Sequence, residues 1–162
     1  MSKKVLCRDI HGAEFYVDLE EIKHFRPSVY GVAVNDGKVV LSKQFGDGYD
    51  FPGGGMDKGE SIEEALVREF KEETGLEVKP IKQLLVHDNV FQTPMDKSIV
   101  HSILIYYACE VIGGTLGDVK FDQWEEQYAD MPEWIDLAEI DKLKFYNAVE
   151  SRALIRQVME LK

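Results

Sequence analysis

The residues with the clearest chemical potential are three glutamates, Glu69, Glu72 and Glu73, in the segment GGMDKGESIEEALVREFKEETGL (54–76). On a helix they are i, i+3 and i+4 neighbours, so their carboxylates lie on one side. Like charges this close repel one another, and a divalent cation such as Mg²⁺ or Mn²⁺, which prefers oxygen ligands, would relieve the repulsion. Bound Mg²⁺ also takes phosphate oxygens, which indicates a phosphate ester or anhydride as substrate.

The residues around these glutamates predict how they are positioned. The run Pro52-Gly53-Gly54-Gly55 is a loop whose backbone can approach metal or phosphate closely. A helix then follows: Ser61 and Glu64 form a capping box, and Gly75 suits the left-handed position at the end. Its buried stripe is predicted to be Ile62, Leu66 and Phe70. Without the glycines ahead of it, a Glu-rich helix of this kind would more simply be a solvated surface.

The rest of the chain predicts an α/β fold with a mixed sheet and helices on both faces. Two short strands around Asp9-Ile10-His11-Gly12 form an N-terminal β-hairpin within an extension over residues 1–24, and Asn35-Asp36-Gly37 joins two further strands. A continuously apolar run, 103–109, suits a central strand. The remaining predicted elements are strands at 80–87, 99–112 and 131–136, helices at 137–143 and 147–161, and a loop over most of 113–130.

Length and charge restrict the function. The 162 residues are most simply one domain, 1–162, and the net charge of −11 disfavours binding to nucleic-acid polymers or anionic membranes. A small phosphorylated substrate remains compatible with this charge, because a bound divalent cation inverts the local field. There is no apolar run of membrane-spanning length and no signal-like N-terminus, so we expect a cytoplasmic protein. The two cysteines, Cys7 and Cys109, are then expected to be reduced core residues rather than a disulfide.

The segment 54–76 resembles the Nudix box: Gly, five residues, Glu, seven residues, then Arg-Glu-apolar-x-Glu-Glu-x-Gly-apolar. Every fixed position is matched, and Phe70 stands where the family more often has an aliphatic residue. The box covers about a seventh of the chain, and a strand containing Trp134 before a terminal helix also resembles the family. The resemblance implies the Nudix α/β/α sandwich. It also implies a MutT-like hydrolase that cleaves nucleoside diphosphates linked to another group, with Mg²⁺ or Mn²⁺ as the cofactor.

The resemblance also implies roles for individual residues. Glu72 and Glu73 match the principal metal ligands of the family. Glu69 matches a further ligand, which in some members orients or deprotonates the water. Gly54 matches a glycine whose backbone carbonyl can bind metal. Arg68 and Glu60 match positions that brace the loop and helix through polar contacts, and Gly75 matches a structural position of the box. On the helix, Arg68 is expected to project away from the three carboxylates.

The general base and the substrate contacts are less well defined by the sequence. Family members often use a Glu outside the box, and here the acidic loop before Trp134 offers Glu125 and Glu126, then Asp122; a solvated loop is an equal reading. Aromatic residues flanking the glycine loop are candidates for stacking on a base or ribose, although ordinary packing explains each one as well: Phe45, Tyr49 and Phe51.

The substrate itself stays open at this stage. Gln92 and Thr93 stand where subfamily signatures for ADP-ribose and dinucleoside polyphosphate hydrolases have Pro and Tyr. The small size favours a nucleoside triphosphate or modified nucleotide, and the alternatives are an ADP-ribose or nucleotide-sugar pyrophosphatase, a non-catalytic nucleotide-binding module, and an isoprenoid diphosphate isomerase, which would need a better-placed cysteine. The N-terminal hairpin offers an edge strand through which two copies could form a homodimer.

Overall fold

The computed structural model describes residues 2–121, 123, 125–127 and 129–161. Its two α-helices are α1 (Ile62–Thr74) and α2 (Ser151–Glu160), and its short 3₁₀ helices are η1 (Leu19–Glu21), η2 (Glu125–Gln127) and η3 (Leu137–Lys142). The strands are β1 (Lys4–Arg8), β2 (Glu14–Asp18), β3 (Ile22–Asn35), β4 (Lys38–Gln44), β5 (Gly48–Asp50), β6 (Gly53–Gly55), β7 (Leu76–Gln92), β8 (Ile99–Gly114) and β9 (Glu133–Asp136).

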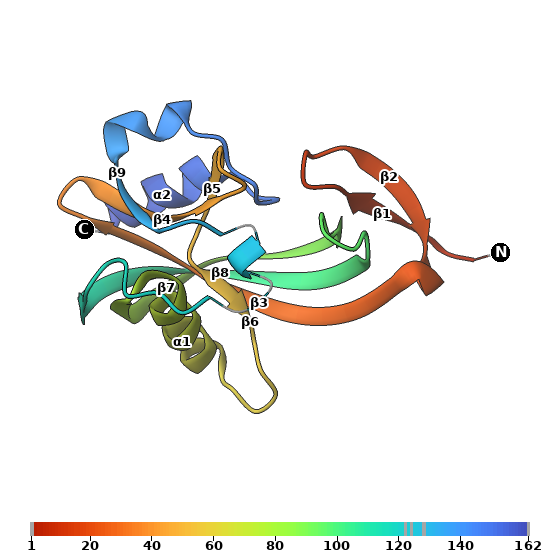
Figure 1. Cartoon of the computed structure of the whole chain (residues 1–162), viewed down its shortest axis with the longest axis horizontal. Helices are drawn as coiled ribbons and strands as arrows, with labels where there is room; N and C mark the ends of the chain where they lie inside the picture. Colours follow the sequence, from red (N-terminus) through yellow and green to blue (C-terminus); the bar gives the residue numbers. More distant parts are fainter. Residues whose placement is uncertain (1, 122, 124, 128, 162) are drawn as a thin grey trace.

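Within the described residues, the strands form one mixed sheet in the order β2-β1-β7-β8-β3-β4-β5. The pair β3 and β8 is parallel and runs from Ile22 opposite Ile99 to Ala33 opposite Cys109. The glycine strand β6 is antiparallel to β3, and β9 is antiparallel to β4. Figure 1 shows the result: three long strands, β3, β7 and β8, carry α1 below them, the β4, β5, β9 and α2 group above one end, and the β1–β2 hairpin at the other end.

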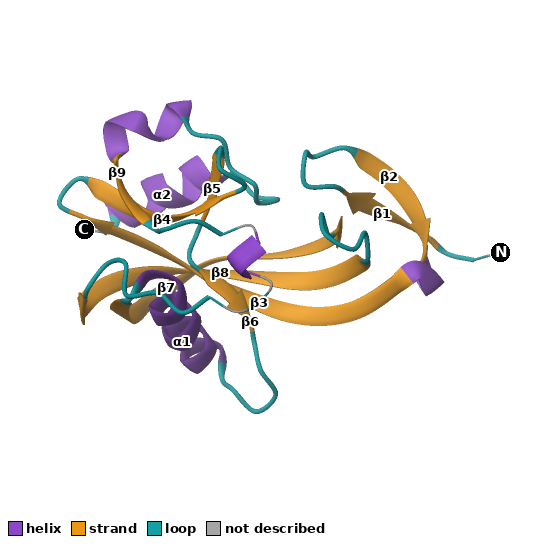
Figure 2. Ribbon diagram, in the orientation of Figure 1, coloured by secondary structure: helices purple, strands orange, loops and turns teal. Residues whose placement is uncertain are grey.

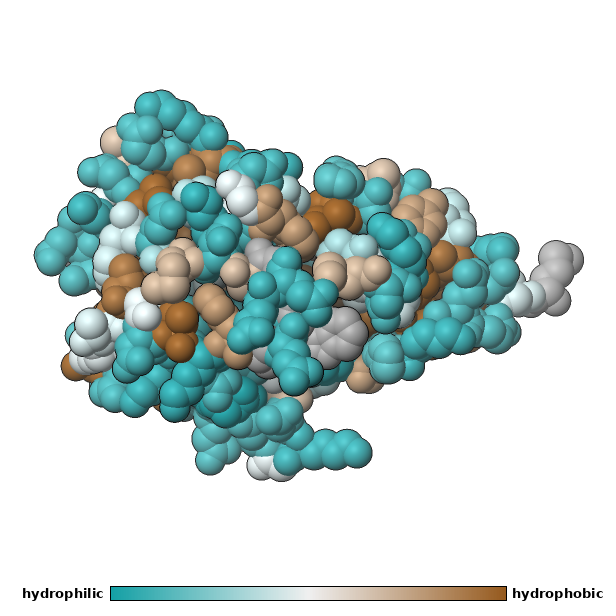
Figure 3. All heavy atoms as spheres, viewed as in Figure 1, coloured by the Kyte–Doolittle hydropathy of each residue, from teal (hydrophilic) through white to brown (hydrophobic). Residues whose placement is uncertain are grey.

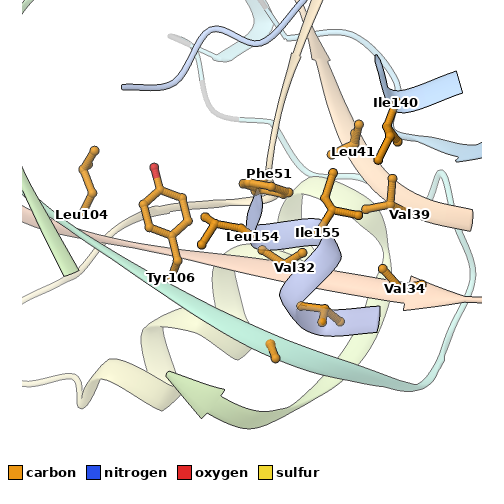
Figure 4. Packing of buried hydrophobic residues seen from close by; sticks show 12 residues of the cluster. Val32, Val34, Val39, Leu41, Phe51, Leu104, Tyr106, Ile140, Leu154 and Ile155 are labelled. Carbon is orange, nitrogen blue, oxygen red and sulfur yellow. The ribbon is translucent and has the colours of Figure 1, made fainter. Parts of the chain in front are cut away.

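The sheet is covered on both faces, as the sequence predicts, because side chains alternate along its strands. On β3, Val32 and Val34 pack with Leu154 and Ile155 of α2 (Figure 4), whereas Val29 and Ala33 pack with α1. Figure 2 shows these two helices on opposite sides of the strands. The predicted central run on β8 is divided in the same way: Tyr106 and Ala108 face α2, and Cys109 faces α1.

The predicted signals of α1 are confirmed. Ser61 Oγ accepts from the Glu64 backbone N–H, Glu64 Oε2 accepts from the Ser61 N–H at 2.8 Å, and Gly75 ends the helix in the left-handed region at φ 78°. Leu66 and Phe70 are fully buried against the sheet. Because the stripe fixes the rotation of α1, the glutamates on its neighbouring face are directed toward the glycine strand β6.

Several elements differ from the predicted ones. A 3₁₀ helix over Leu137–Lys142 replaces the α-helix predicted at 137–143, and α2 begins at Ser151 rather than at residue 147. The chain before α2 instead pairs with β5: Phe145 forms a bridge with Tyr49, Tyr49 N–H donates to Lys144 O, and Tyr146 N–H donates to Tyr49 O. Strand β3 passes through residue 24, so the N-terminal extension continues directly into the central sheet.

The two cysteines lie in the interior, as the sequence predicts. Cys7 and Cys109 are buried and free, 1% and 4% exposed. Burial raises the pKa of the Cys109 thiol to about 12, which leaves it an inert core group. None of the helices among the described residues has the length and apolar character to cross a membrane.

Candidate active site

A cavity of about 1480 Å³ is lined both by glutamates of α1 and by residues 144–148, which precede α2. Ligand sites are commonly 300–1,000 Å³, so this one has room for more than a compact ligand. The β6 glycines and the glutamates of α1 line it, together with residues 144–148 and with residues of the β1–β2 turn and the first half of β3. Because the β4, β5, β9 and α2 group and the β1–β2 hairpin lie toward different ends of the long strands (Figure 1), the last two sets form two ends of the cavity, with the glutamates between them. The surface over α1 and the loop before it is strongly hydrophilic (Figure 3).

Arg68 joins three of the glutamates. Its Nε and Nη2 donate to the two oxygens of Glu60 at 2.6 and 2.7 Å, which is a bidentate pair, and its Nη1 donates to Glu69 at 2.8 Å and to Glu72 at 3.3 Å. The expectation that Arg68 projects away from the metal-binding carboxylates is therefore wrong. Its side chain is long enough to bend back over the next turn, where it supplies the positive charge that Glu69 and Glu72 share.

Glu60 and Arg68 brace the loop as predicted. Glu60 Oε2 also accepts from the Asp57 backbone N–H at 2.9 Å, and Arg68 Nη2 donates to the Gly55 carbonyl at 3.3 Å. The hydrogen bonds from Arg68 lower the pKa of Glu60 to about 2, and the same pairing raises that of Arg68. Both groups stay charged at every physiological pH, so the link between the loop and α1 is permanent.

Glu73 is held by a different set of donors. Its Oε2 accepts from Ser42 Oγ on β4 at 2.8 Å and from the Gly53 backbone N–H at 3.2 Å. The side chain is 8% exposed, and burial raises its pKa well above the usual range, opposed by the Ser42 hydrogen bond. Ser42 was not identified from the sequence; the available signal was a polar residue ending the apolar run 39–41 of a buried strand.

Two glycines allow the close approaches that the loop requires. A Cβ at Gly54 would lie 2.4 Å from Glu69 Oε2, so only glycine lets that carboxylate rest against the loop backbone. A Cβ at Gly55 would lie 1.8 Å from Cζ of Arg26, whose guanidinium therefore lies over the loop and lines the cavity. Arg26 is a cation next to the carboxylates that sequence reasoning missed, because it precedes Pro27 in a strand 28 residues before Gly54.

The donor set fits a hard divalent cation. Glu69 is 7% exposed, and its pKa is raised, mainly by burial and against the effect of Arg68. Buried carboxylates that resist ionisation are the groups a cation stabilises most. Across the described residues, no three acidic, His or Cys side chains converge on one point. Glu69 and Glu72 are drawn together by Arg68, while Glu73 is turned toward Ser42 and Gly53.

The two candidates for the general base separate in the structure. Both lie on η2, but Glu125 lines the cavity and its charge contributes to raising the pKa of Glu69 and of Glu73, so it lies near both. Glu126 is exposed and is not among the residues that line the cavity. The third candidate, Asp122, lies outside the described residues.

Of the predicted aromatic contacts, one lines the cavity. Phe45 does so, edge-on to Tyr146 with ring centroids 5.0 Å apart, and its φ of 53° is in the left-handed region. The prediction is wrong for Phe51, which is 1% exposed in the core that packs against α2. Tyr49 lies outside the cavity lining, and its hydroxyl contacts Glu133 at 3.4 Å. Asp50, which stands between these two residues, lines the cavity instead.

Similarity to known proteins identifies the family of this chain. The model of the NUDIX domain matches residues 24–158 of the 162. The chain belongs to the Nudix family. It is 35% identical over 151 residues to the ADP-ribose pyrophosphatase of Methanocaldococcus jannaschii, a match that covers 89% of this chain and 78% of that protein. It is 38% identical over 80 residues to an RNA pyrophosphohydrolase of Actinobacillus pleuropneumoniae, covering 48% of this chain and 39% of that one.

Solved structures agree on the Nudix fold. An ADP-ribose pyrophosphatase from Streptococcus suis superposes with a TM-score of 0.61 at 16% identity, over 84% of this chain and 90% of that one. A NUDIX hydrolase from Nitrosomonas europaea gives 0.59 at 22% identity, over 83% and 86% of the two chains. This protein is a Nudix pyrophosphohydrolase. Nudix hydrolases use divalent metals and act on small nucleotide substrates.

Proposed function

We propose that this Nudix hydrolase cleaves the diphosphate of a nucleoside diphosphate that carries a second polar group, ADP-ribose being the leading substrate, with Mg²⁺ as its cation and Mn²⁺ as a substitute. The observation that carries the proposal is the two-ended cavity, with the glutamates of α1 at its centre. A diphosphate at the centre leaves one end for the nucleoside and the other for a second group. The relative with 35% identity over most of the chain is named as an ADP-ribose pyrophosphatase, which supports the same choice.

The two ends of the cavity differ in the side chains they present. Residues 144–148 bring Phe145 and Tyr146 beside Tyr30 and Tyr106, which makes that end aromatic. The floor of the other end, on β3 and β8, carries polar groups: Ser102 Oγ donates to the Arg26 carbonyl at 2.7 Å and lies 3.2 Å from Ser28 Oγ. Phe25 and Phe91 also line the cavity on this side. Stacking suits a base, and hydroxyl and carbonyl groups suit a sugar. A nucleoside triphosphate would leave the polar end unused.

In the proposed reaction, water attacks one phosphorus atom and the bond from that phosphorus to the bridging oxygen breaks, giving a nucleoside monophosphate and a phosphorylated second group. Glu69, Glu72, Glu73 and the Gly54 carbonyl would hold the cation, which when bound neutralises the diphosphate and acidifies the attacking water. Arg26 would contact a phosphate oxygen, since its guanidinium already lies over the glycine loop.

Glu125 is the proposed general base. It lines the cavity near Glu69 and Glu73 and would take the proton of the attacking water. Arg68 and Glu60 act on position alone, by fixing α1 against the loop through their bidentate pair.

The test is release of AMP and ribose 5-phosphate from ADP-ribose, with and without Mg²⁺ or Mn²⁺. Parallel reactions would contain nucleotide sugars, nucleoside triphosphates, oxidised guanine nucleotides and dinucleoside polyphosphates, and Glu73→Gln would be the inactive control. We expect metal-dependent hydrolysis with ADP-ribose or a nucleotide sugar as the best substrate. A higher kcat/KM for triphosphates would overturn the two-group substrate, and nucleotide binding without turnover of any compound would indicate a binding module.

A further inference from the structure

Asp50 stands out as a carboxylate in the wall of the cavity that the proposed chemistry does not use. It ends β5, three residues before the glycine strand, and lines the cavity together with Asn147. Its Oδ1 accepts two hydrogen bonds, from the Phe51 backbone N–H at 2.7 Å and from Asn147 Nδ2 at 2.9 Å. No described residue donates to Oδ2, so one carboxylate oxygen retains its acceptor capacity at the cavity wall.

Asn147 is fixed by the same set of contacts. Its Oδ1 accepts from Ser151 Oγ at 2.6 Å, and Ser151, at the start of α2, is 2% exposed. With Oδ1 bound to Ser151 and one Nδ2 hydrogen donated to Asp50, the amide has a second Nδ2 hydrogen left. The pair therefore presents one acceptor and one donor side by side, in orientations that neighbouring backbone and helix fix in advance.

The walls around the pair are aromatic. Tyr30 and Tyr106 are stacked with centroids 5.3 Å apart, and Phe45 and Tyr146 meet edge to face; all four line the cavity. Phe45 holds its place with a left-handed backbone, a conformation that costs free energy for a non-glycine residue. A flat ligand with a donor beside an acceptor on one edge matches this combination, and nucleobases have that form.

We propose that Asp50 and Asn147 read the edge of the substrate's base, and that the base is adenine. The exocyclic amine of adenine donates to Asp50 Oδ2, and its ring N1 accepts from Asn147 Nδ2. Adenine is chosen over other bases because this inference rests on the proposed function, in which an ADP group is the nucleotide half. The nucleotide then points toward α2, and the second group lies on the floor formed by β3 and β8.

Hypoxanthine provides a direct test, because it differs from adenine at the two reading positions. A 6-oxo acceptor replaces the amine, and N1 carries a hydrogen, so both contacts become unfavourable. We expect the wild-type enzyme to prefer ADP-ribose to IDP-ribose by about 10-fold or more in kcat/KM, mainly through KM. The variant Asp50→Asn, which can keep both hydrogen bonds to Oδ1, should reduce that preference to less than about 3-fold, the spread within which we treat two substrates as equivalent.

Asp47→Asn is the matched control. Asp47 is also a carboxylate bound to the 144–147 segment, through Lys144 Nζ at 2.9 Å and the Tyr146 hydroxyl, but it lies outside the cavity lining. This variant should keep the wild-type preference for adenine. If Asp50→Asn lowers hydrolysis of both substrates equally, or if the wild-type enzyme treats them alike, Asp50 only supports the fold and the inference is overturned.

Binding of AMP and IMP by calorimetry separates this inference from the proposed function. We expect AMP to bind about 10-fold more tightly than IMP in the wild type and about equally in Asp50→Asn. This result would stand even if ADP-ribose were not hydrolysed, in which case only the choice of second group would fail. Equal affinities of the wild type for AMP and IMP would refute base reading, whatever the turnover.

Discussion

At the scale of single residues, charge and burial set the properties of the site. Glu69 and Glu73 are carboxylates that the protein keeps at 7% and 8% exposure, and Arg68 and Ser42 are the groups that make this tolerable. Without a cation, their ionised forms are partly compensated by these donors. A substitution that removes the charge of one of these glutamates without changing its shape should therefore abolish hydrolysis and leave the fold intact.

Glu73→Gln and Glu72→Gln are each expected to lower kcat by about 10²-fold or more, because metal-assisted phosphoryl transfer depends on the charged oxygens. The circular dichroism spectrum should be unchanged. The matched control is Glu126→Gln, a glutamate outside the cavity lining, which should retain full activity. Persistent turnover by both active-site variants would contradict their assignment as metal ligands.

The pH dependence of stability should carry the signature of Asp50. Burial raises its pKa from 3.8 to about 6 in the folded state, so between these values the folded protein holds the proton more firmly than the unfolded chain. Its contribution to stability is thus most favourable at or below pH 4, falls as pH rises and is fully lost above about pH 6. Urea unfolding of Asp50→Asn should show a stability gain over wild type that grows by up to about 3 kcal/mol from pH 4 to 7.

Asp47→Asn should show the opposite trend. Hydrogen bonds from Tyr146 and Lys144 lower the pKa of Asp47, so its carboxylate stabilises the fold above the unfolded-state pKa and loses this contribution on acidification. Removal of the charge should cost stability at pH 7 and little in strong acid. Parallel pH trends for the two variants would show that a general charge effect, and not local burial, governs them.

At the scale of elements, the position of α1 is set by one close approach. A Cβ on Gly31 of β3 would lie 2.6 Å from Cδ2 of Phe70, so the helix rests directly on the strand backbone. Phe70 replaces the aliphatic residue more often found in the box, and the glycine opposite it accommodates the larger ring. The carboxylates stand on the neighbouring face of the same helix, so their placement depends on this contact.

Gly31→Ala is expected to destabilise the protein by about 1–3 kcal/mol through overpacking, and to lower kcat because α1 is displaced from the glycine loop. The double variant Gly31→Ala/Phe70→Leu should recover much of both losses, since leucine gives up the atoms that clash. Chemical denaturation and steady-state kinetics of the two single variants and the double variant measure the coupling. Additive losses would show that the two residues do not compete for the same space.

At the scale of the whole molecule, the net charge of −11 and the carboxylate cluster act in the same direction. The electrostatic repulsion that both of them cause decreases when a cation binds the folded state. We expect Mg²⁺ to raise the thermal midpoint of the wild type, by linkage of binding to folding, and to shift Glu73→Gln much less. Scanning calorimetry at matched ionic strength separates stabilisation by specific Mg²⁺ binding from general screening of surface charge by salt. An equal shift in both proteins would indicate general screening of the acidic surface.

Two intermolecular properties, pairing of two copies and binding to nucleic acid, remain predictions. Strand β2 is at the edge of the sheet, so two copies could pair through the hairpin. Light scattering would measure whether the protein is a dimer. The acidic surface predicts no affinity for nucleic-acid polymers, which a titration with single-stranded RNA at low salt would check.

The local features of this protein can be predicted from its amino-acid sequence. The box at 54–76, the capping box at Ser61, the left-handed Gly75 and the two-faced apolar strands all depend on contacts within a few residues, so spacing alone predicts them. The contacts between side chains far apart in the sequence depend on how the strands and helices pack, and spacing along the chain does not predict them. Ser42 reaches Glu73, Arg26 covers Gly55, and Asn147 holds Asp50 over 97 residues of chain. Phe51 packs in the core beside α2, whereas Phe45, in the turn between β4 and β5, lines the cavity; contacts with distant elements, and not sequence adjacency, set these two positions.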